Sequence, residues 1–161
     1  MAKYVPLEQA TRQDTWRLNV HIENLNTRDM EDFGIWDKKT GGEVDSEDNI
    51  YHPGGMEDAI SLGGLRSTGN VTLQRLYKLN RDHGTGSSGR GVQALFNRAG
   101  KAKIKIAQHP MDINGHIFGN PIVYMGKLKR VAVPDVDSEA SGAALIEIEA
   151  SIQGFPTRPV S

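Results

Sequence analysis

The chain of 161 residues contains no cysteine, and aromatic residues make up only 6% of it. Without cysteine there is no disulfide framework, no thiolate metal site and no cysteine nucleophile. With four tyrosines, four phenylalanines and two tryptophans, the chain is also short of the aromatic platforms on which sugar-binding β-sandwiches usually rely. A free carbohydrate-binding module is therefore disfavoured.

Long apolar runs are missing as well. No stretch approaches 18 apolar residues, so we expect no membrane-spanning helix. The N-terminal residues MAKYVPLEQATRQ lack the apolar centre of a secretory signal, so none is expected. The length is that of one domain, residues 1–161, large enough to bury roughly 70% of its unfolded surface.

The net charge of −1 conceals a segregation along the chain. Residues 1–69 carry a net charge of −6, residues 70–134 carry +9, and residues 135–161 carry −4. These blocks either mix in space and cancel, or give the molecule faces of opposite sign suited to head-to-tail association. The overall balance is not the basic one usual for a nucleic-acid-binding domain.

One motif suggests nucleotide binding but lacks the required context. Residues 84–89, GTGSSG, match GxGxxG before a helix, but the nearby strand of residues 101–107 alternates lysine with apolar residues and would be half exposed. The dinucleotide fingerprint needs a buried βαβ unit. Read as a phosphate-binding loop, the segment has Arg90 in place of lysine and Gly91 in place of the hydroxyl residue. We therefore interpret it as the loop that leads into the helix.

Other constellations for catalysis or metal binding are incomplete. The five histidines are scattered, and only His109 and His116 flank a common turn, with no third ligand. Residues 135–139 begin like a calcium loop, but Ala140 stands where that loop needs glycine. No GxSxG serine elbow occurs. We expect no enzyme activity, no metal and no cofactor.

Hydrophobic periodicity predicts a mainly β protein. In most of the segments predicted to be strands, apolar and polar residues alternate, as in antiparallel sheets that have one solvent-exposed face. The expected strands are residues 16–22, 33–37, 71–77, 101–107, 121–133 and 143–153. Residues 38–42 read as a turn, and one helix is predicted over residues 89–99, with Val92, Leu95, Phe96 and Ala99 forming its apolar stripe. The predicted fold is an antiparallel β-sandwich or squashed barrel with one α-helix. An N-terminal segment (residues 1–14) precedes it and a C-terminal tail (residues 154–161) follows it.

The most informative segment is residues 50–77, IYHPGGMEDAISLGGLRSTGNVTLQRLY. Two glycine pairs interrupt it, so we interpret residues 45–65 as a long shaped loop that feeds a strand. Long ordered loops are usually functional, and this one carries apolar residues without catalytic groups. It is predicted to dock on a neighbouring subunit through Tyr51, Pro53, Gly54, Gly55, Met56, Ile60 and Leu62.

Together with residues 126–154, GKLKRVAVPDVDSEASGAALIEIEASIQG, this segment resembles the major tail tube protein of long-tailed bacteriophages. The resemblance implies a non-enzymatic virion protein, assembled in the bacterial cytoplasm. Its hexameric rings would stack into a channel that conducts DNA without binding it, and its partners would be a tape measure protein and terminator or tip proteins. The alternatives are a tube subunit of a contractile injection or secretion system, and a soluble β-sandwich binding module.

The closing strand has two distinct faces. Ala144, Ile146, Ile148, Ala150 and Ile152 share one face, which should pack on the core. The candidate residues for the channel wall occupy the other: Glu147, Glu149, Ser151 and Gln153. An acidic wall would repel the DNA backbone, and the alternative is that this face meets outside solvent.

Overall fold

Seven antiparallel strands form the main sheet. The computed structural model describes residues 12, 14–55, 58–83, 91–112, 114–139, 141–154 and 156. The sheet has the order β2-β1-β9-β10-β11-β8-β3. Its strands are β1 (Trp16–Glu23), β2 (Met30–Trp36), β3 (Lys38–Gly41), β8 (Val71–Leu76), β9 (Lys103–Pro110), β10 (Ile122–Ala132) and β11 (Leu145–Ile152). All six neighbouring pairs are antiparallel, which confirms the predicted fold class.

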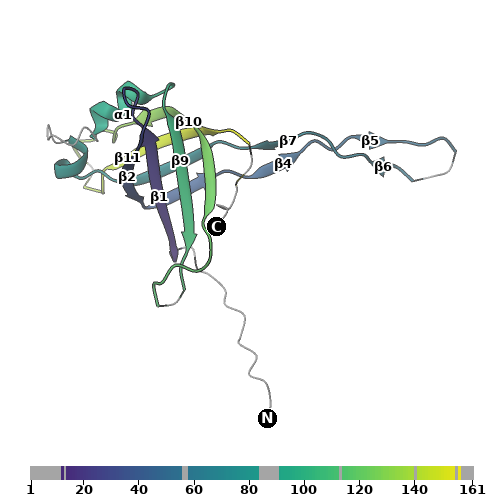
Figure 1. Cartoon of the computed structure of the whole chain (residues 1–161), viewed down its shortest axis with the longest axis horizontal. Coiled ribbons are helices and arrows are strands. Elements are labelled where there is room, and N and C mark those ends of the chain that lie inside the picture. Colours follow the sequence, from purple (N-terminus) through teal and green to yellow (C-terminus); the bar gives the residue numbers. More distant parts are fainter. Residues whose placement is uncertain are drawn as a thin grey trace, which may run out of the picture.

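One continuous segment supplies both edges of this sheet. β2 pairs with β1, β3 pairs with β8, and only Asp37 separates β2 from β3. The Asp37 backbone N–H donates to the carbonyl of Gln74 (3.0 Å), and the Leu76 N–H donates to the Asp37 carboxylate (3.1 Å). The sheet therefore curls until its edges meet in a squashed barrel, whose wrapping strands are visible in Figure 1.

Apolar side chains fill the barrel. Alternate residues of every long strand point inward, as the period of two requires. Nine of the larger aliphatic residues among them are completely buried: Val20, Ile22, Val71, Leu73, Ile104, Ile106, Leu128, Ile146 and Ile148. Barrels of about eight strands are normally filled in this way. The barrel of one chain is thus a packed core.

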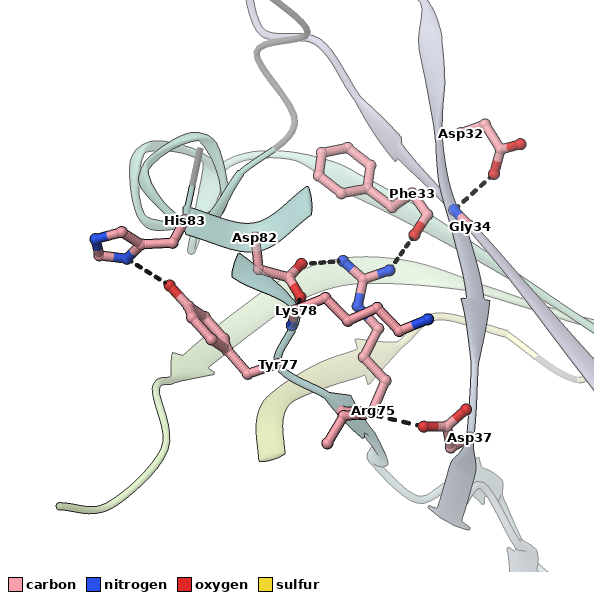
Figure 2. A network of polar contacts seen from close by, with 10 residues as sticks. Asp32, Phe33, Gly34, Asp37, Arg75, Tyr77, Lys78, Asp82 and His83 are labelled. Carbon is pink, nitrogen blue, oxygen red and sulfur yellow. Dashed lines mark hydrogen bonds and ion pairs between the residues drawn. The ribbon is translucent and has the colours of Figure 1, made fainter. Parts of the chain in front are cut away.

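A buried arginine bridges the seam between β2 and β8. Arg75 points inward from β8 and is 1% exposed. Its guanidinium donates to the carbonyl of Phe33 (2.5 Å) and to the carboxylate of Asp82 (2.8 Å), and lies 4.3 Å from the ring centroid of Trp36. Asp82 belongs to a π-helical turn, η1 (Leu79–His83), and Figure 2 shows the contacts of Arg75 with Phe33 and Asp82. Arg75 therefore connects β8, β2 and η1.

The helix α1 (Val92–Arg98) packs beside the end of the barrel where β1 turns into β2. Val92 and Leu95 are buried, and Arg98 forms an ion pair with Glu31 (2.7 Å). The helix is shorter than the predicted residues 89–99, and residues 84–90 lie outside the described ranges. Phe96 is 42% exposed, so its predicted place in the apolar stripe is wrong.

Two predicted irregular segments are strands. Residues 38–42 were expected to form a turn, but β8 pairs with residues 38–41 as β3. Residues 45–65 were expected to be a loop, but most of them form an antiparallel hairpin. Its strands are β4 (Val44–Ser46), β5 (Ile50–Tyr51), β6 (Ile60–Ser61) and β7 (Arg66–Thr68). Among the described residues, no helix is long and apolar enough to cross a membrane.

The seam predicts a clear difference between two arginines. Arg75→Ala removes the guanidinium that balances the buried carboxylate of Asp82, and we expect a loss of about 3–5 kcal/mol in the free energy of unfolding. Arg130→Ala is the matched control, because Arg130 forms exposed ion pairs and its loss should cost much less stability. Urea denaturation followed by tryptophan fluorescence measures both, and equal losses would contradict the role given to Arg75.

Candidate assembly surfaces

The hairpin of residues 43–68 projects away from the barrel as a long two-stranded arm (Figure 1). Val44 pairs with Thr68 at its base and Tyr51 pairs with Ile60 near its tip. Residues 43–52 and 58–67 are all exposed, so the arm has no core of its own. An isolated two-stranded hairpin is at best marginally stable in water. This arm does not fold back on the barrel of its own chain.

A one-residue bulge interrupts the arm at the second glycine pair. Ser46 pairs with Arg66 and Ile50 pairs with Ser61. From Ser46 to Ile50 the chain advances four residues, whereas from Ser61 to Arg66 it advances five. Gly63 has a φ of +71°, and a Cβ on Gly64 would lie 2.6 Å from the carbonyl oxygen of Glu47. The glycines thus allow a β-bulge, which strengthens the local twist.

Beyond the bulge, the arm presents apolar side chains on one face. Tyr51 and Ile60 are paired, and Leu62 lies two residues from Ile60 on the same face. They are 56%, 49% and 66% exposed, respectively. The structure thus brings together three of the predicted docking residues. Pro53, Gly54 and Gly55 lie at the tip, and Met56 lies outside the described residues.

The base of the arm is tied to the barrel. Gly41 and Gly42 have φ values of +85° and +82°, and a Cβ at either position would collide with residues of the barrel. The Thr68 hydroxyl donates to the carbonyl of Gly154 (2.6 Å), next to the end of β11. The direction in which the arm leaves the barrel is therefore set by specific contacts at its base.

The outer face of β11 carries the predicted channel-wall residues. Ile146, Ile148 and Ala150 are fully buried, as predicted for the inward face. Ala144 precedes the strand and is exposed, and Ile152 is only half-buried. Glu147 and Glu149 point outward, where both carboxylates bind Arg130 of β10. Glu147 also accepts from Gln74 (2.9 Å), and Glu149 accepts from Asn70 (3.1 Å).

This face holds compensated charges. Lys129 lies 3.7 Å from Glu149, so two cations of β10 face two carboxylates of β11. Partial burial disfavours ionisation of Glu149, but hydrogen bonds from Asn70 and Arg130 and the nearby positive charges outweigh it and lower the pKa of its carboxyl. Ser151 pairs with Lys127 of β10, and Gln153 lies exposed just beyond the strand.

The sequence alone misses Arg130 and Gln74 as partners of these carboxylates. Both come from strands that neighbour β11 in the sheet, and Gln74 is 73 residues away along the chain. The register of β10 and β11, which includes a bulge near Arg130, decides which cation meets which carboxylate. Strand alternation gives the face of each residue but not this register.

The other candidate sites do not gather ligands. Among the described residues, no three histidine, aspartate or glutamate side chains come together as a metal site would require. Asp112 accepts backbone N–H groups of Asn114 and His116 (2.9 and 3.0 Å), which stabilises the turn between β9 and β10. The GxGxxG segment, residues 84–89, lies outside the described ranges.

Chains of two injection systems match the fold of this chain over most of their length. A chain from the six-fold symmetrised anti-feeding prophage baseplate matches at TM-score 0.65 and 12% identity, over 92% of this chain and 95% of that one. A chain from the PVC sheath/tube terminator in the extended state gives 0.66 and 12%, over 96% and 100%. A third, from the PVC sheath–tube complex in the extended state, gives 0.62 and 12%, over 96% and 95%.

The chain has a tail-tube-like fold. No protein-family model matches its sequence, and no curated protein matches it as a relative. The resemblance seen in the sequence therefore holds at the level of the tail-tube fold, and the three structures named above are parts of injection systems.

The position of Arg130 between the carboxylates of Glu147 and Glu149 leads to a testable prediction about the pKa of Glu149. In Arg130→Ala, Glu149 loses a hydrogen bond and a positive charge, so the pKa of its carboxyl should rise. Any stability that Glu149 contributes through its lowered pKa is present above the unfolded value and is lost as pH falls through the folded pKa. Carboxyl NMR titration measures the shift, with Arg28→Ala as the control variant. An unchanged Glu149 pKa would contradict the assignment.

Proposed function

We propose that the protein is the structural, non-enzymatic subunit of a hollow tube in a contractile injection machine. The observation that carries this proposal is the projecting arm, whose apolar side chains have no partner surface on the barrel of their own chain. Exposed apolar surface of this kind marks interaction sites. The shared fold over almost the full length of injection-system chains supports the same function.

A channel has to lie between copies of the chain. The barrel of one copy is filled by aliphatic side chains, and barrels with aqueous channels need about 16 strands or more. Several subunits around an axis supply that number. Rings of six copies are the arrangement that the phage resemblance implies, and the anti-feeding prophage baseplate was itself symmetrised six-fold.

The arm would join one copy to another. Its face of Tyr51, Ile60 and Leu62 provides the contact, and the bulge at Gly63 and Gly64 shapes its path. Because the arm and the surface that receives it are different, the contact is heterologous, and such contacts close into rings or extend into filaments. Sheath, terminator and tape-measure proteins are the further partners of such a tube.

The outer face of β11 is our candidate for the channel wall. Its paired charges leave little net charge to hold a passing polyanion, since affinity for phosphates grows with each uncompensated lysine or arginine. A phage tail tube that conducts DNA is the second candidate function, favoured by the motifs of residues 50–77 and 126–154. The particle, rather than a membrane, is the expected location in both cases.

Replacing the outer part of the arm tests its role in assembly. An Asn-Gly turn in place of residues 47–65 would connect the paired residues Ser46 and Arg66 in a tight hairpin. We expect a folded subunit with unchanged circular dichroism that no longer forms tubes in negative-stain micrographs. The matched control keeps the arm but changes Val136, a 98% exposed loop residue, to Ser. Tubes formed without the arm would refute its role.

The lack of cysteine makes the channel-wall proposal testable by labelling. In Gln153→Cys the new thiol is the only one in the chain, and the position is exposed in the free subunit. In assembled tubes we expect a small maleimide to react and a maleimide on a polymer too large to enter the tube to be excluded. The unassembled variant, which should react with both reagents, is the control. Equal labelling of tubes and free subunits by the large reagent would place residue 153 outside the channel.

A further inference from the structure

Two cavities meet where the chain passes from β2 to β3. Asp37 lines both of them. One, of about 580 Å³, opens between β2 and the end of β8, and the other, of about 540 Å³, opens between β3 and the start of β1. Ligand-sized clefts have volumes of about 300–1,000 Å³. We call this region the Asp37 corner, defined by Arg17, Ile35, Asp37, Lys38, Leu76 and Lys78.

The Asp37 corner is basic. Apart from Arg75, whose charge Asp82 balances, the cavities are lined by four cations, Arg17, Lys38, Lys39 and Lys78, and by two carboxylates, Asp32 and Asp37. Both carboxylates accept backbone N–H groups, from Gly34 and Leu76. Within the described part of the chain, no salt bridge engages Arg17, Lys38 or Lys78.

The same corner exposes apolar side chains at its lip. Ile35 is 47% exposed and Leu76 is 40% exposed, although both belong to strands of the main sheet. They lie on the two sides of the β2–β8 seam, and the larger cavity opens between them. A ligand that matches this surface therefore combines apolar side chains with negative charge.

The projecting arm has this combination. Beside its apolar face of Tyr51, Ile60 and Leu62, its exposed carboxylates outnumber its cations. The described carboxylates are Glu43, Asp45, Glu47, Asp48 and Asp58, and the described cation is Arg66. The arm extends away from the barrel (Figure 1), so its tip does not reach the corner of its own chain.

We propose that the Asp37 corner receives the arm of a second copy of this chain. Apolar residues of the arm cover Ile35 and Leu76, and its carboxylates approach Arg17, Lys38 and Lys78. This inference rests on the proposed function, because it specifies the surface through which one tube subunit binds the next. It also gives Ile35 and Leu76, which are exposed in a single chain, an apolar partner.

Site-specific cross-linking tests the contact directly. A photoreactive benzoylphenylalanine replaces Tyr51, and tubes are assembled from an equal mixture of ¹⁵N-labelled and unlabelled chains. After irradiation, mass spectrometry should find mixed-isotope cross-links from residue 51 to peptides covering residues 30–41 or 71–79. Tubes that form but cross-link elsewhere, or only within one copy, would overturn the docking site and leave the tube function standing. Failure of the unmodified chain to form any tube would overturn both.

Substitutions at the lip give an independent measurement. Leu76→Asp adds a charge to the apolar contact and repels the acidic arm, so the critical concentration for assembly should rise by about tenfold or more. Phe118→Asp is the control, because Phe118 is 65% exposed in the loop after β9 and should leave assembly unchanged. Circular dichroism checks that both variants fold.

The basic residues are tested by salt. Lys38→Glu with Lys78→Glu should weaken assembly strongly at a Debye length of about 10 Å and only slightly at about 3 Å. The unmodified chain should itself assemble less readily as salt rises. Two results would contradict the proposal. One is an equal rise in critical concentration for Leu76→Asp and Phe118→Asp, and the other is an assembly defect of the Lys38→Glu, Lys78→Glu variant that does not change with salt.

Discussion

The closure of the barrel depends on the arginine at its seam. Between β2 and the end of β8 the backbone ladder stops, and the side chain of Arg75 connects the two strands instead, through the carbonyl of Phe33 and the carboxylate of Asp82. A buried ion pair of this kind adds little stability over an apolar replacement, but loss of one partner is costly. What the structure shows is that Arg75 joins three elements: β2, β8 and the turn η1.

Closure has consequences for everything outside the barrel. Because residues 30–41 form both edges of the sheet, the chain reaches the base of the arm directly after crossing the seam. Gly41 and Gly42 then redirect it, so the direction of the arm is coupled to the seam through only four residues of β3. The buried apolar residues lie inside the barrel, whereas the apolar residues of the arm are exposed. The chain thus combines a barrel that has its own core with an arm that has none.

Much of the barrel could be predicted from the sequence, because its long strands alternate cleanly. The inward positions of Val20, Leu73, Ile104 and Ile148 follow from a period of two, and all are fully buried. The edge strand β3 could not be predicted, because KKTG carries no alternation and is held by the strand beside it. The arm was also misread, since glycine pairs indicate loops, whereas here one pair makes a bulge within a hairpin.

The charge pattern shows where sequence order and space agree and where they diverge. On the arm, the acidic block of residues 1–69 stays unmixed, since the arm pairs only with itself. On the outer face of β10 and β11, the basic and the C-terminal acidic blocks meet and cancel at Arg130, Glu147 and Glu149. Both interpretations of the segregation therefore apply, each to a different surface. Opposite charges meet where a strand of the basic segment pairs with a strand of an acidic segment. They stay unbalanced in the arm, which comes from the acidic segment alone. The net effect is a subunit whose β11 carboxylates are paired with cations of β10 and whose arm is acidic.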